Sequence, residues 1–171
     1  MKKYIFFLLI PLIIHGNVCD SIKKNVIIGD SCTPLIAKYT ENAKLSIWKS
    51  GIGIDWLIRS LDIRKSDFDV SNVIINIGTN DSFNINSNIC KLFSSLRRAY
   101  PCANFIAVQG SWGWGNNKRI KESKVKAFYE VFRSYGAYII DPPIGSVKNP
   151  HLDLYVYTLI GKEIDKKLKS I

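Results

Sequence analysis

Four polar stretches of the sequence hold residue types that can activate a hydroxyl group and stabilise an oxyanion. Gly29-Asp30-Ser31 follows one apolar run, Ser50-Gly51-Ile52-Gly53 is a glycine-rich turn, Gly78-Thr79-Asn80-Asp81 follows another apolar run, and His151 lies near the C-terminus. A serine hydroxyl becomes a nucleophile when an imidazole takes its proton, and N–H donors stabilise the oxyanion formed by attack on a carbonyl. Each stretch alone also fits a helix cap or a turn, but together they predict acyl-transfer chemistry.

The rest of the composition narrows the candidate chemistry. Of the two histidines, His15 lies in the apolar N-terminal segment, which makes His151 the candidate base of a folded domain. Cys32, beside Ser31, is a rival nucleophile. Because it lies next to a buried strand, we expect it to be a small core residue instead. The four cysteines form no C-x-x-C pair, and we expect no metal site and no cofactor.

Short apolar runs alternate with helical patterns along the chain, and this order positions the polar stretches. Strands are predicted at 25–28, 44–48, 71–77, 104–108 and 137–140, and helices at 34–42, 55–61, 85–100, 122–135 and 157–168. The alternation predicts an α/β protein, namely a three-layer α/β/α sandwich around a flavodoxin-like, five-stranded parallel sheet. Because such sheets bind ligands beyond the carboxyl ends of their strands, the polar stretches are expected to converge there.

The N-terminal segment is predicted to be a secretory signal peptide. Lys2 and Lys3 precede an apolar run from Tyr4 to Ile14, which is too short to span a bilayer. We expect a signal peptide over 1–16, with cleavage as late as residue 19 as an alternative, followed by one domain over 20–171. The protein is therefore expected to be secreted or periplasmic. An uncleaved membrane anchor and a buried strand are the other readings of this segment.

The chain is strongly basic, with a formal net charge of +10 at pH 7. The basic residues are scattered and no nucleic-acid-binding motif accompanies them, so no nucleic-acid partner is expected. A solvated basic face is the simplest reading, and binding to an anionic glycan or membrane surface is the alternative. We expect a monomer.

The polar stretches resemble the sequence blocks of the SGNH (GDSL) esterases and lipases, in the same order. The segment from Val26 to Ser31 is similar to the family's strand and nucleophile turn, and the segment from Val73 to Asp81 is its closest match. Gly51 precedes Leu57 by six residues, as the family's glycine precedes its helix leucine. Asn149-Pro150-His151, with Tyr157 beyond it, resembles the last block. The resemblance covers essentially the whole chain after the signal peptide and implies the SGNH hydrolase fold.

The resemblance also implies a role for each block. Ser31 would be the nucleophile and His151 the base, and the oxyanion donors would be the Ser31 amide, the Gly51 amide and the Asn80 side chain, with Gly53 as the substitute for Gly51. Asp30 and Asp81 are expected to order their loops.

The sequence departs from the family at Lys148, where an aspartate usually precedes the histidine by three residues. Asp141 and Asp153 are candidate replacements, and a backbone carbonyl that orients His151 in a Ser-His dyad is the third option. With Lys148 there we expect slow turnover that rises with pH as His151 loses its proton.

The expected function is therefore a secreted serine esterase that hydrolyses carboxylic esters, either O-acetylated glycans or small acyl and lysolipid esters. The alternative is a catalytically degenerate SGNH-fold module that binds carbohydrate or a protein partner. Trp112 and Trp114, after the fourth strand, would either contact substrate or pack within their loop. In an exported protein, Cys90 or Cys102 could pair with Cys19.

Overall fold

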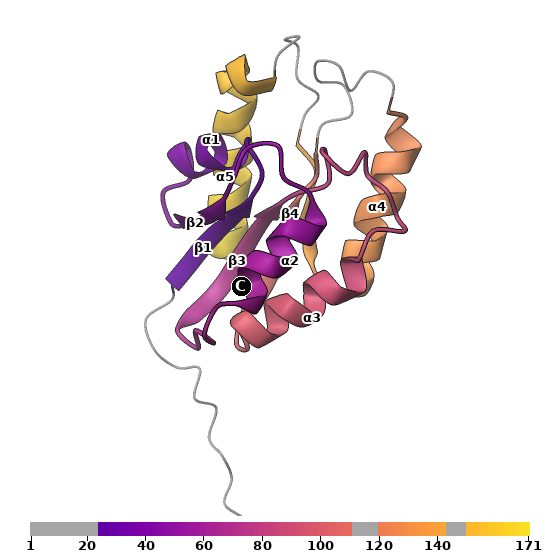
Figure 1. Cartoon of the computed structure of the whole chain (residues 1–171). Helices are drawn as coiled ribbons and strands as arrows, with labels where there is room; N and C mark the ends of the chain where they lie inside the picture. The colour runs from indigo at the N-terminus through magenta and orange to yellow at the C-terminus, as the bar shows by residue number, and fades with distance from the viewer. Residues whose placement is uncertain (1–23, 111–119, 143–149) are drawn as a thin grey trace, which may run out of the picture.

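The computed structural model describes residues 24–110, 120–142 and 150–171, and its centre is one parallel β-sheet (Figure 1). The strands are β1 (Lys24–Gly29), β2 (Lys44–Trp48), β3 (Val70–Asn76), β4 (Asn104–Val108) and β5 (Tyr138–Ile140). All pairs are parallel and the order is β2-β1-β3-β4-β5. Successive strands are added to one side of β1 up to β2 and to its other side from β3 onward. The strand order therefore reverses between β1 and β3, and such switch points open a crevice for ligands.

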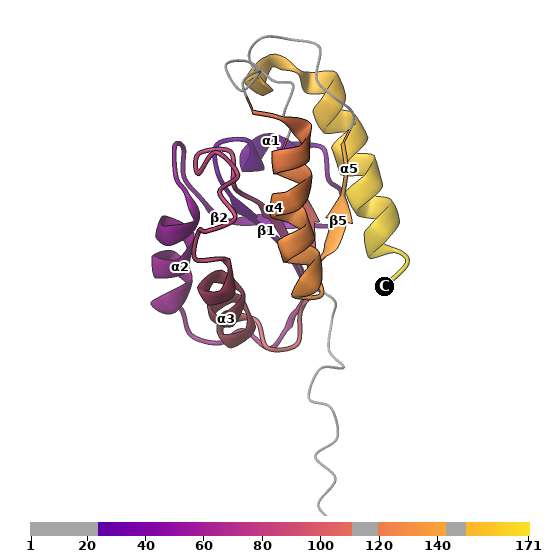
Figure 2. The ribbon, with the colours of Figure 1, turned by 90° about the vertical axis from the view of Figure 1, so that its right-hand side faces the viewer.

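Helices cover both faces of the sheet. They are α1 (Thr33–Lys38), α2 (Ile54–Asp62), α3 (Ile89–Ala99), α4 (Glu122–Ser134) and α5 (Leu154–Leu168), with a 3₁₀ turn, η2 (Pro150–Leu152), before α5. The core on one face joins the sheet to α2, α3 and α4, and the core on the other joins it to α1 and α5. Figure 2 shows α5 on one side and α2 and α3 on the other. Consequently the predicted three-layer α/β/α sandwich is confirmed.

The apolar runs become buried strands because helices shield both faces. Ile27, Ile28, Val73, Ile74 and Ile75 are all fully buried, as expected for central parallel strands. Asparagine side chains also join three strands in register: Asn72 donates to Asn25 at 2.7 Å and Asn104 donates to Asn72 at 3.2 Å. These bonds satisfy the buried Asn72 amide and favour one register of β1, β3 and β4.

Three helix boundaries differ from the prediction by three or four residues, and the other helix boundaries agree within one. Helix α1 ends at Lys38 and not at 42, since the next residues form a turn whose Glu41 and Asn42 amides donate to Asp165. Helix α3 begins at Ile89 and not at 85, because the asparagine-rich stretch before it forms turns. Helix α5 begins at Leu154 and not at 157, because the Asp153 carboxylate caps it by accepting from the Val156 amide.

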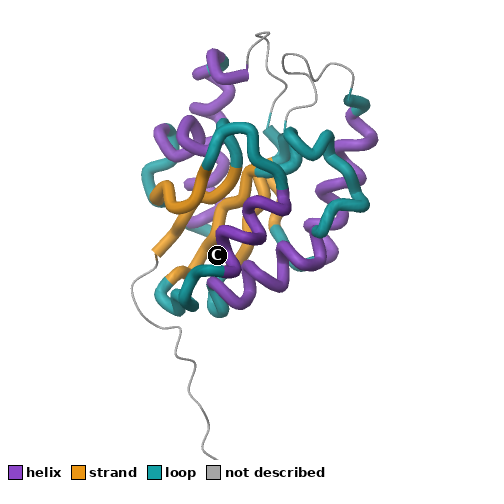
Figure 3. The backbone as a smooth tube through the Cα atoms, viewed as in Figure 1, coloured by secondary structure: helices purple, strands orange, loops and turns teal. Residues whose placement is uncertain are grey.

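None of the helices in the described ranges is long and apolar enough to cross a membrane. The predicted signal peptide, 1–16, lies outside those ranges. Figure 3 shows the strands enclosed by helices, with the loops that follow β2 and β3 at one end of the sheet.

Candidate active site

Ser31 is placed at the carboxyl end of β1 by a tight turn. Gly29 has φ +147° and lies so close to β3 that a Cβ there would be 1.9 Å from the Asn76 carbonyl oxygen. The Asp30 amide then donates to the same oxygen at 3.0 Å. Glycine is needed at position 29 for both its φ angle and this close approach. The turn leaves Ser31 at the sheet's switch point, between β1 and the start of α1.

His151 meets Ser31 across 120 residues of sequence. Its Nε2 atom lies 3.0 Å from Ser31 Oγ, which is hydrogen-bonding distance. The histidine is part of η2, and helix α5, capped by Asp153, follows directly. The Ser31 side chain is half-buried and His151 is exposed. A hydroxyl and an imidazole nitrogen in this geometry can exchange a proton.

The Asp30 carboxylate lies beneath the nucleophile turn. It accepts a hydrogen bond from the Cys32 amide at 3.0 Å, and its side chain is almost fully buried. The pKa of Asp30 is raised to about 6, mainly by burial and also by repulsion from Asp81, while the bond from Cys32 opposes the shift. Asp30 therefore braces the loop that carries Ser31, in agreement with the expected ordering role.

Cys32 is a poor competitor for nucleophilic attack. Its thiol is free, and burial together with the nearby Asp30 charge raises the thiol pKa to about 12. The thiolate is the reactive form, so at neutral pH Cys32 is held in its unreactive, protonated state.

The loops that contain Gly51 and Asn80 are bound to each other. Asn80 Nδ2 donates to the Ile52 carbonyl oxygen at 2.8 Å, and the Ile54 amide at the start of α2 donates to the Asp81 carboxylate at 3.0 Å. Burial raises the pKa of Asp81, although the bond from Ile54 opposes this shift. The second N–H of the Asn80 carboxamide has no acceptor among the described residues and can donate to another group. The two predicted donor loops therefore form one unit beside the ends of β1 and β3.

Gly51 and Gly53 differ in their surroundings. Gly51 has φ +70°, is exposed, and has open space where a side chain would start. At Gly53 a Cβ would be 2.2 Å from the Asp81 carboxylate. Gly53 is needed for the packing of Asp81 against α2, whereas Gly51 leaves its backbone accessible.

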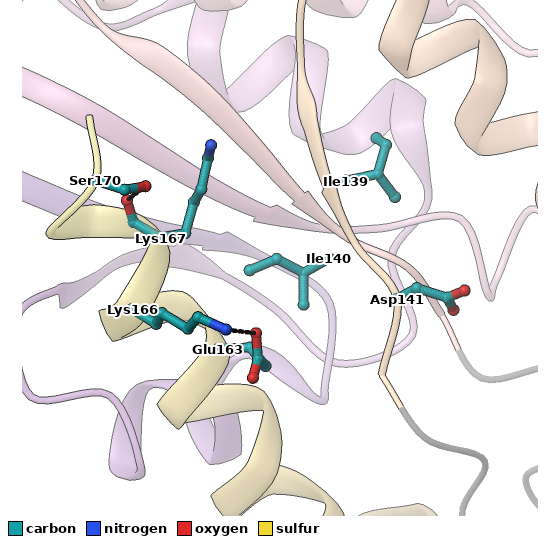
Figure 4. Close-up of a pocket in the computed structure, with 7 residues that line it drawn as sticks. All are labelled: Ile139, Ile140, Asp141, Glu163, Lys166, Lys167 and Ser170. Carbon is teal, nitrogen blue, oxygen red and sulfur yellow. Dashed lines mark hydrogen bonds and ion pairs between the residues drawn. The ribbon is translucent and has the colours of Figure 1, made fainter.

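The two candidate carboxylates for His151 have other contacts. Asp153 caps α5, and Asp141 accepts from the Gln109 side-chain amide at 2.8 Å. Asp141 also lines a pocket of about 310 Å³ between β5 and the end of α5, where its carboxylate points away from Glu163 and Lys166 (Figure 4). Lys148, Trp112 and Trp114 lie outside the described residues.

One site contact had no signal in the sequence. Tyr129 lies in the helix predicted over 122–135 and the sequence assigns it no role there, but its hydroxyl donates to the Ile77 carbonyl and accepts from the Gly110 amide, just beyond the ends of β3 and β4. A buried tyrosine at helical spacing is indistinguishable from a packing residue until the tertiary structure shows where its hydroxyl lies.

Comparison with solved structures identifies the fold. The chain is similar to the lipase/acylhydrolase from Enterococcus faecalis, with a TM-score of 0.63 and 15% identity over 87% of this chain and 96% of that one. A member of the lipolytic G-D-S-L family from Veillonella parvula has a TM-score of 0.61 and 13% identity over 85% and 100% of the two chains. The C-terminal catalytic domain of peptidoglycan O-acetyltransferase A from Streptococcus pneumoniae has a TM-score of 0.60 and 11% identity over 86% and 95%.

No protein-family model matches the sequence, and no curated protein matches it. The structural likeness confirms that the chain has the SGNH hydrolase fold, as the sequence blocks had predicted.

Proposed function

We propose that this protein is a serine esterase that hydrolyses carboxylic esters through Ser31 and His151. The observation that carries the proposal is the 3.0 Å contact between Ser31 Oγ and His151 Nε2. It lies at the switch point of the sheet, where this class of fold binds its ligands. The similarity in fold to lipolytic proteins and to an O-acetyltransferase supports acyl chemistry.

Attack begins with a proton transfer. His151 Nε2 removes the Ser31 hydroxyl proton while Oγ forms a bond to the ester carbonyl carbon, and the carbonyl electrons move to oxygen. The neutral imidazole is the form that can accept this proton, so activity requires His151 to be unprotonated.

The oxyanion would be stabilised by N–H donors on three loops. The Ser31 and Gly51 amides and the Asn80 carboxamide are the proposed donors. The bond from Asn80 to Ile52 supports this role, because it fixes the carboxamide before substrate arrives and uses only one of its two N–H groups in the part of the chain that the structure describes. Donors that need no reorganisation stabilise the transition state most effectively.

Two further steps complete the cycle. The imidazolium donates its proton to the departing alkoxide, and an acyl group remains bonded to Ser31 Oγ. Water then attacks the acyl carbon while His151 takes one of its protons. The bond between the acyl carbon and Ser31 Oγ breaks, His151 returns the proton to Oγ, and the carboxylic acid leaves. The group that orients His151 is proposed to be Asp141, Asp153 or a backbone carbonyl.

The proposed substrates are O-acetylated glycans, or small acyl and lysolipid esters. Export through the N-terminal segment would bring the enzyme to such esters at the cell surface. Its net charge, +10 for the whole chain and +8 once Lys2 and Lys3 are removed with the signal peptide, would favour anionic ones. Hydrolysis rates on acetylated sugars and on esters of increasing acyl length would distinguish the two classes.

The test compares wild type with Ser31→Ala and His151→Gln on a short-chain ester of p-nitrophenol. Both substitutions should lower kcat by at least about 10³, because each removes a participant in the same proton transfer. Cys32→Ala is the matched control and should retain activity. If wild type is inert on all esters but binds glycan, the protein is the degenerate binding module.

A further inference from the structure

Tyr129 connects the ends of two central strands from the middle of α4. Its side chain is 1% exposed, and its ring packs against Phe83, Phe128 and Phe132 with centroid separations of 6.1, 5.1 and 5.4 Å. A phenylalanine would fill the same volume. What the tyrosine adds is a hydroxyl in a buried position.

That hydroxyl makes two hydrogen bonds to backbone. It donates to the Ile77 carbonyl at 2.8 Å and accepts from the Gly110 amide at 3.0 Å. The ladder between β3 and β4 ends at the pair Ile75–Ala107, so these bonds connect the two strands beyond their last direct pairing. Burial raises the pKa of Tyr129 far above its ordinary value, which keeps the hydroxyl protonated as a donor.

Ile77, whose carbonyl accepts from Tyr129, directly precedes the turn over residues 78–83 that carries Asn80 (the Asn80 turn). In that turn the Asp81 and Phe83 amides donate to the Gly78 carbonyl at 3.1 and 2.9 Å. Gly78 has φ +119°, and a Cβ there would be 2.7 Å from the Phe128 ring, so aromatic side chains fill the space behind the turn. The position of the Asn80 turn relative to the sheet therefore depends on the position of the Ile77 backbone.

The Gly110 bond ties a second loop to the same point. A Cβ at Gly110 would be 2.6 Å from the Phe83 ring and 3.2 Å from Thr79 Oγ1, so this backbone packs directly on the Asn80 turn. Without the hydroxyl, the Ile77 carbonyl and the Gly110 amide would both lose a buried partner, which is costly.

The geometry points to Tyr129 as a positioning residue of the oxyanion hole, which holds the Asn80 carboxamide in place through the Ile77 carbonyl. This inference rests on the proposed esterase function, in which Asn80 is an oxyanion donor. Tyr129 touches no reacting atom and acts only through the backbone that carries Asn80.

The kinetic test is a double-mutant cycle on a p-nitrophenyl ester. Tyr129→Phe should lower kcat about tenfold with KM changed less than about twofold, because a displaced donor affects mainly the transition state. In an Asn80→Ala background the same substitution should change kcat less than about twofold. Equal effects in both backgrounds would overturn the inference. Tyr100→Phe is the matched control, since it removes a buried hydroxyl that makes no hydrogen bond within the described residues.

Amide hydrogen exchange tests the positioning without any need for catalysis. Tyr129→Phe should speed exchange about tenfold or more in residues 78–83 and at Gly110, while amides of β1 stay protected. Tyr100→Phe should leave these rates unchanged. Unchanged exchange in Tyr129→Phe would overturn the inference even for an active enzyme, whereas faster exchange in an inert protein would refute only the esterase function.

Discussion

The turn after β1 places the proposed nucleophile, Ser31, next to a thiol that is unreactive at neutral pH. Ser31 faces His151, whereas the neighbouring Cys32 is kept protonated by burial and by the Asp30 charge. The intrinsically better nucleophile is thus the one that the environment suppresses. Selection between the two depends on the surroundings of each side chain and not on residue type.

Asp30 should reduce stability at neutral pH. Its folded pKa of about 6 is above the ordinary value of 3.8, so its favourable contribution is complete below pH 4 and is lost as pH rises through 6. Asp30→Asn should therefore raise the free energy of unfolding by about 1–3 kcal/mol at pH 8 and have little effect at pH 4. Urea denaturation at both pH values measures this difference.

Asp67→Asn provides a control of opposite sign. The hydrogen bond from Lys24 lowers the pKa of Asp67, so its contribution is present above pH 4 and is lost on acidification. This substitution should be mildly destabilising at pH 8 only. An Asp30→Asn protein that is less stable than wild type at pH 8 would show that the Asp30 charge is favourable.

Asn80→Ala should lower kcat by roughly 10²–10³ while KM changes much less, because the carboxamide would act on the oxyanion and not on the bound ester. Steady-state kinetics with circular dichroism measures both effects. A loss accompanied by an unfolded spectrum would mean that the Asn80–Ile52 bond serves only the structure of the turn.

Among the elements, α5 directly follows η2, which carries His151, and is anchored through the middle and the C-terminal half of its buried face. Asp165 accepts from the Glu41 and Asn42 amides at 3.0 and 3.1 Å, and Gly161 packs directly on Tyr39. The position of the imidazole thus depends on contacts two to four helical turns away.

Gly161→Ala should weaken both stability and activity. The new Cβ would be 1.9 Å from the Tyr39 carbonyl oxygen, so α5 must move outward. We expect a loss of about 1–3 kcal/mol in unfolding free energy and a lower kcat, as His151 shifts with the helix. Thermal denaturation and ester hydrolysis measure the two effects.

Gly136→Ala is the matched control, because that glycine has φ +83° but open space around it. It should cost about 1 kcal/mol of strain and leave kcat unchanged. An active, fully stable Gly161→Ala protein would contradict the anchoring of α5.

The elements also show how far the sequence alone could lead. The strands were predictable because buried apolar runs such as Val73 to Ile75 leave few alternatives to a central parallel strand. The starts of α3 and α5 were not. The Asn88 side chain, at the start of α3, donates to Asp55 on α2, 33 residues away, and Asp153 caps α5 through its carboxylate, and periodicity reveals neither bond. Ser31 and His151 could be paired from the order of the blocks, whereas the Tyr129 bonds exist only in the tertiary structure.

For the whole molecule, the pairing of the cysteines indicates in which cellular compartment the protein folds. Cys102 is disulfide-bonded, while Cys32 and Cys90 are free. The predicted partner, Cys19, lies outside the described residues. A structural disulfide is typical of exported proteins and so supports the proposed secretion.

Alkylation with iodoacetamide should distinguish Cys32, Cys90 and Cys102, whose environments differ. The native protein should be modified quickly at the exposed Cys90 and slowly at Cys32, whose thiol pKa is about 12. In denaturant without reductant, Cys32 and Cys90 should both react and Cys102 should not. Mass spectrometry of the peptides checks this, and alkylation of Cys102 before reduction would argue against an oxidising compartment.

The proposed function depends on acylation of Ser31 with the help of His151, and covalent labelling detects this step. A fluorophosphonate probe should label wild type, and peptide mass spectrometry should place the adduct on Ser31 Oγ. Labelling should disappear in Ser31→Ala and persist in Cys32→Ala. An adduct on any other residue, or a folded wild type that resists labelling, would show that Ser31 is not the nucleophile.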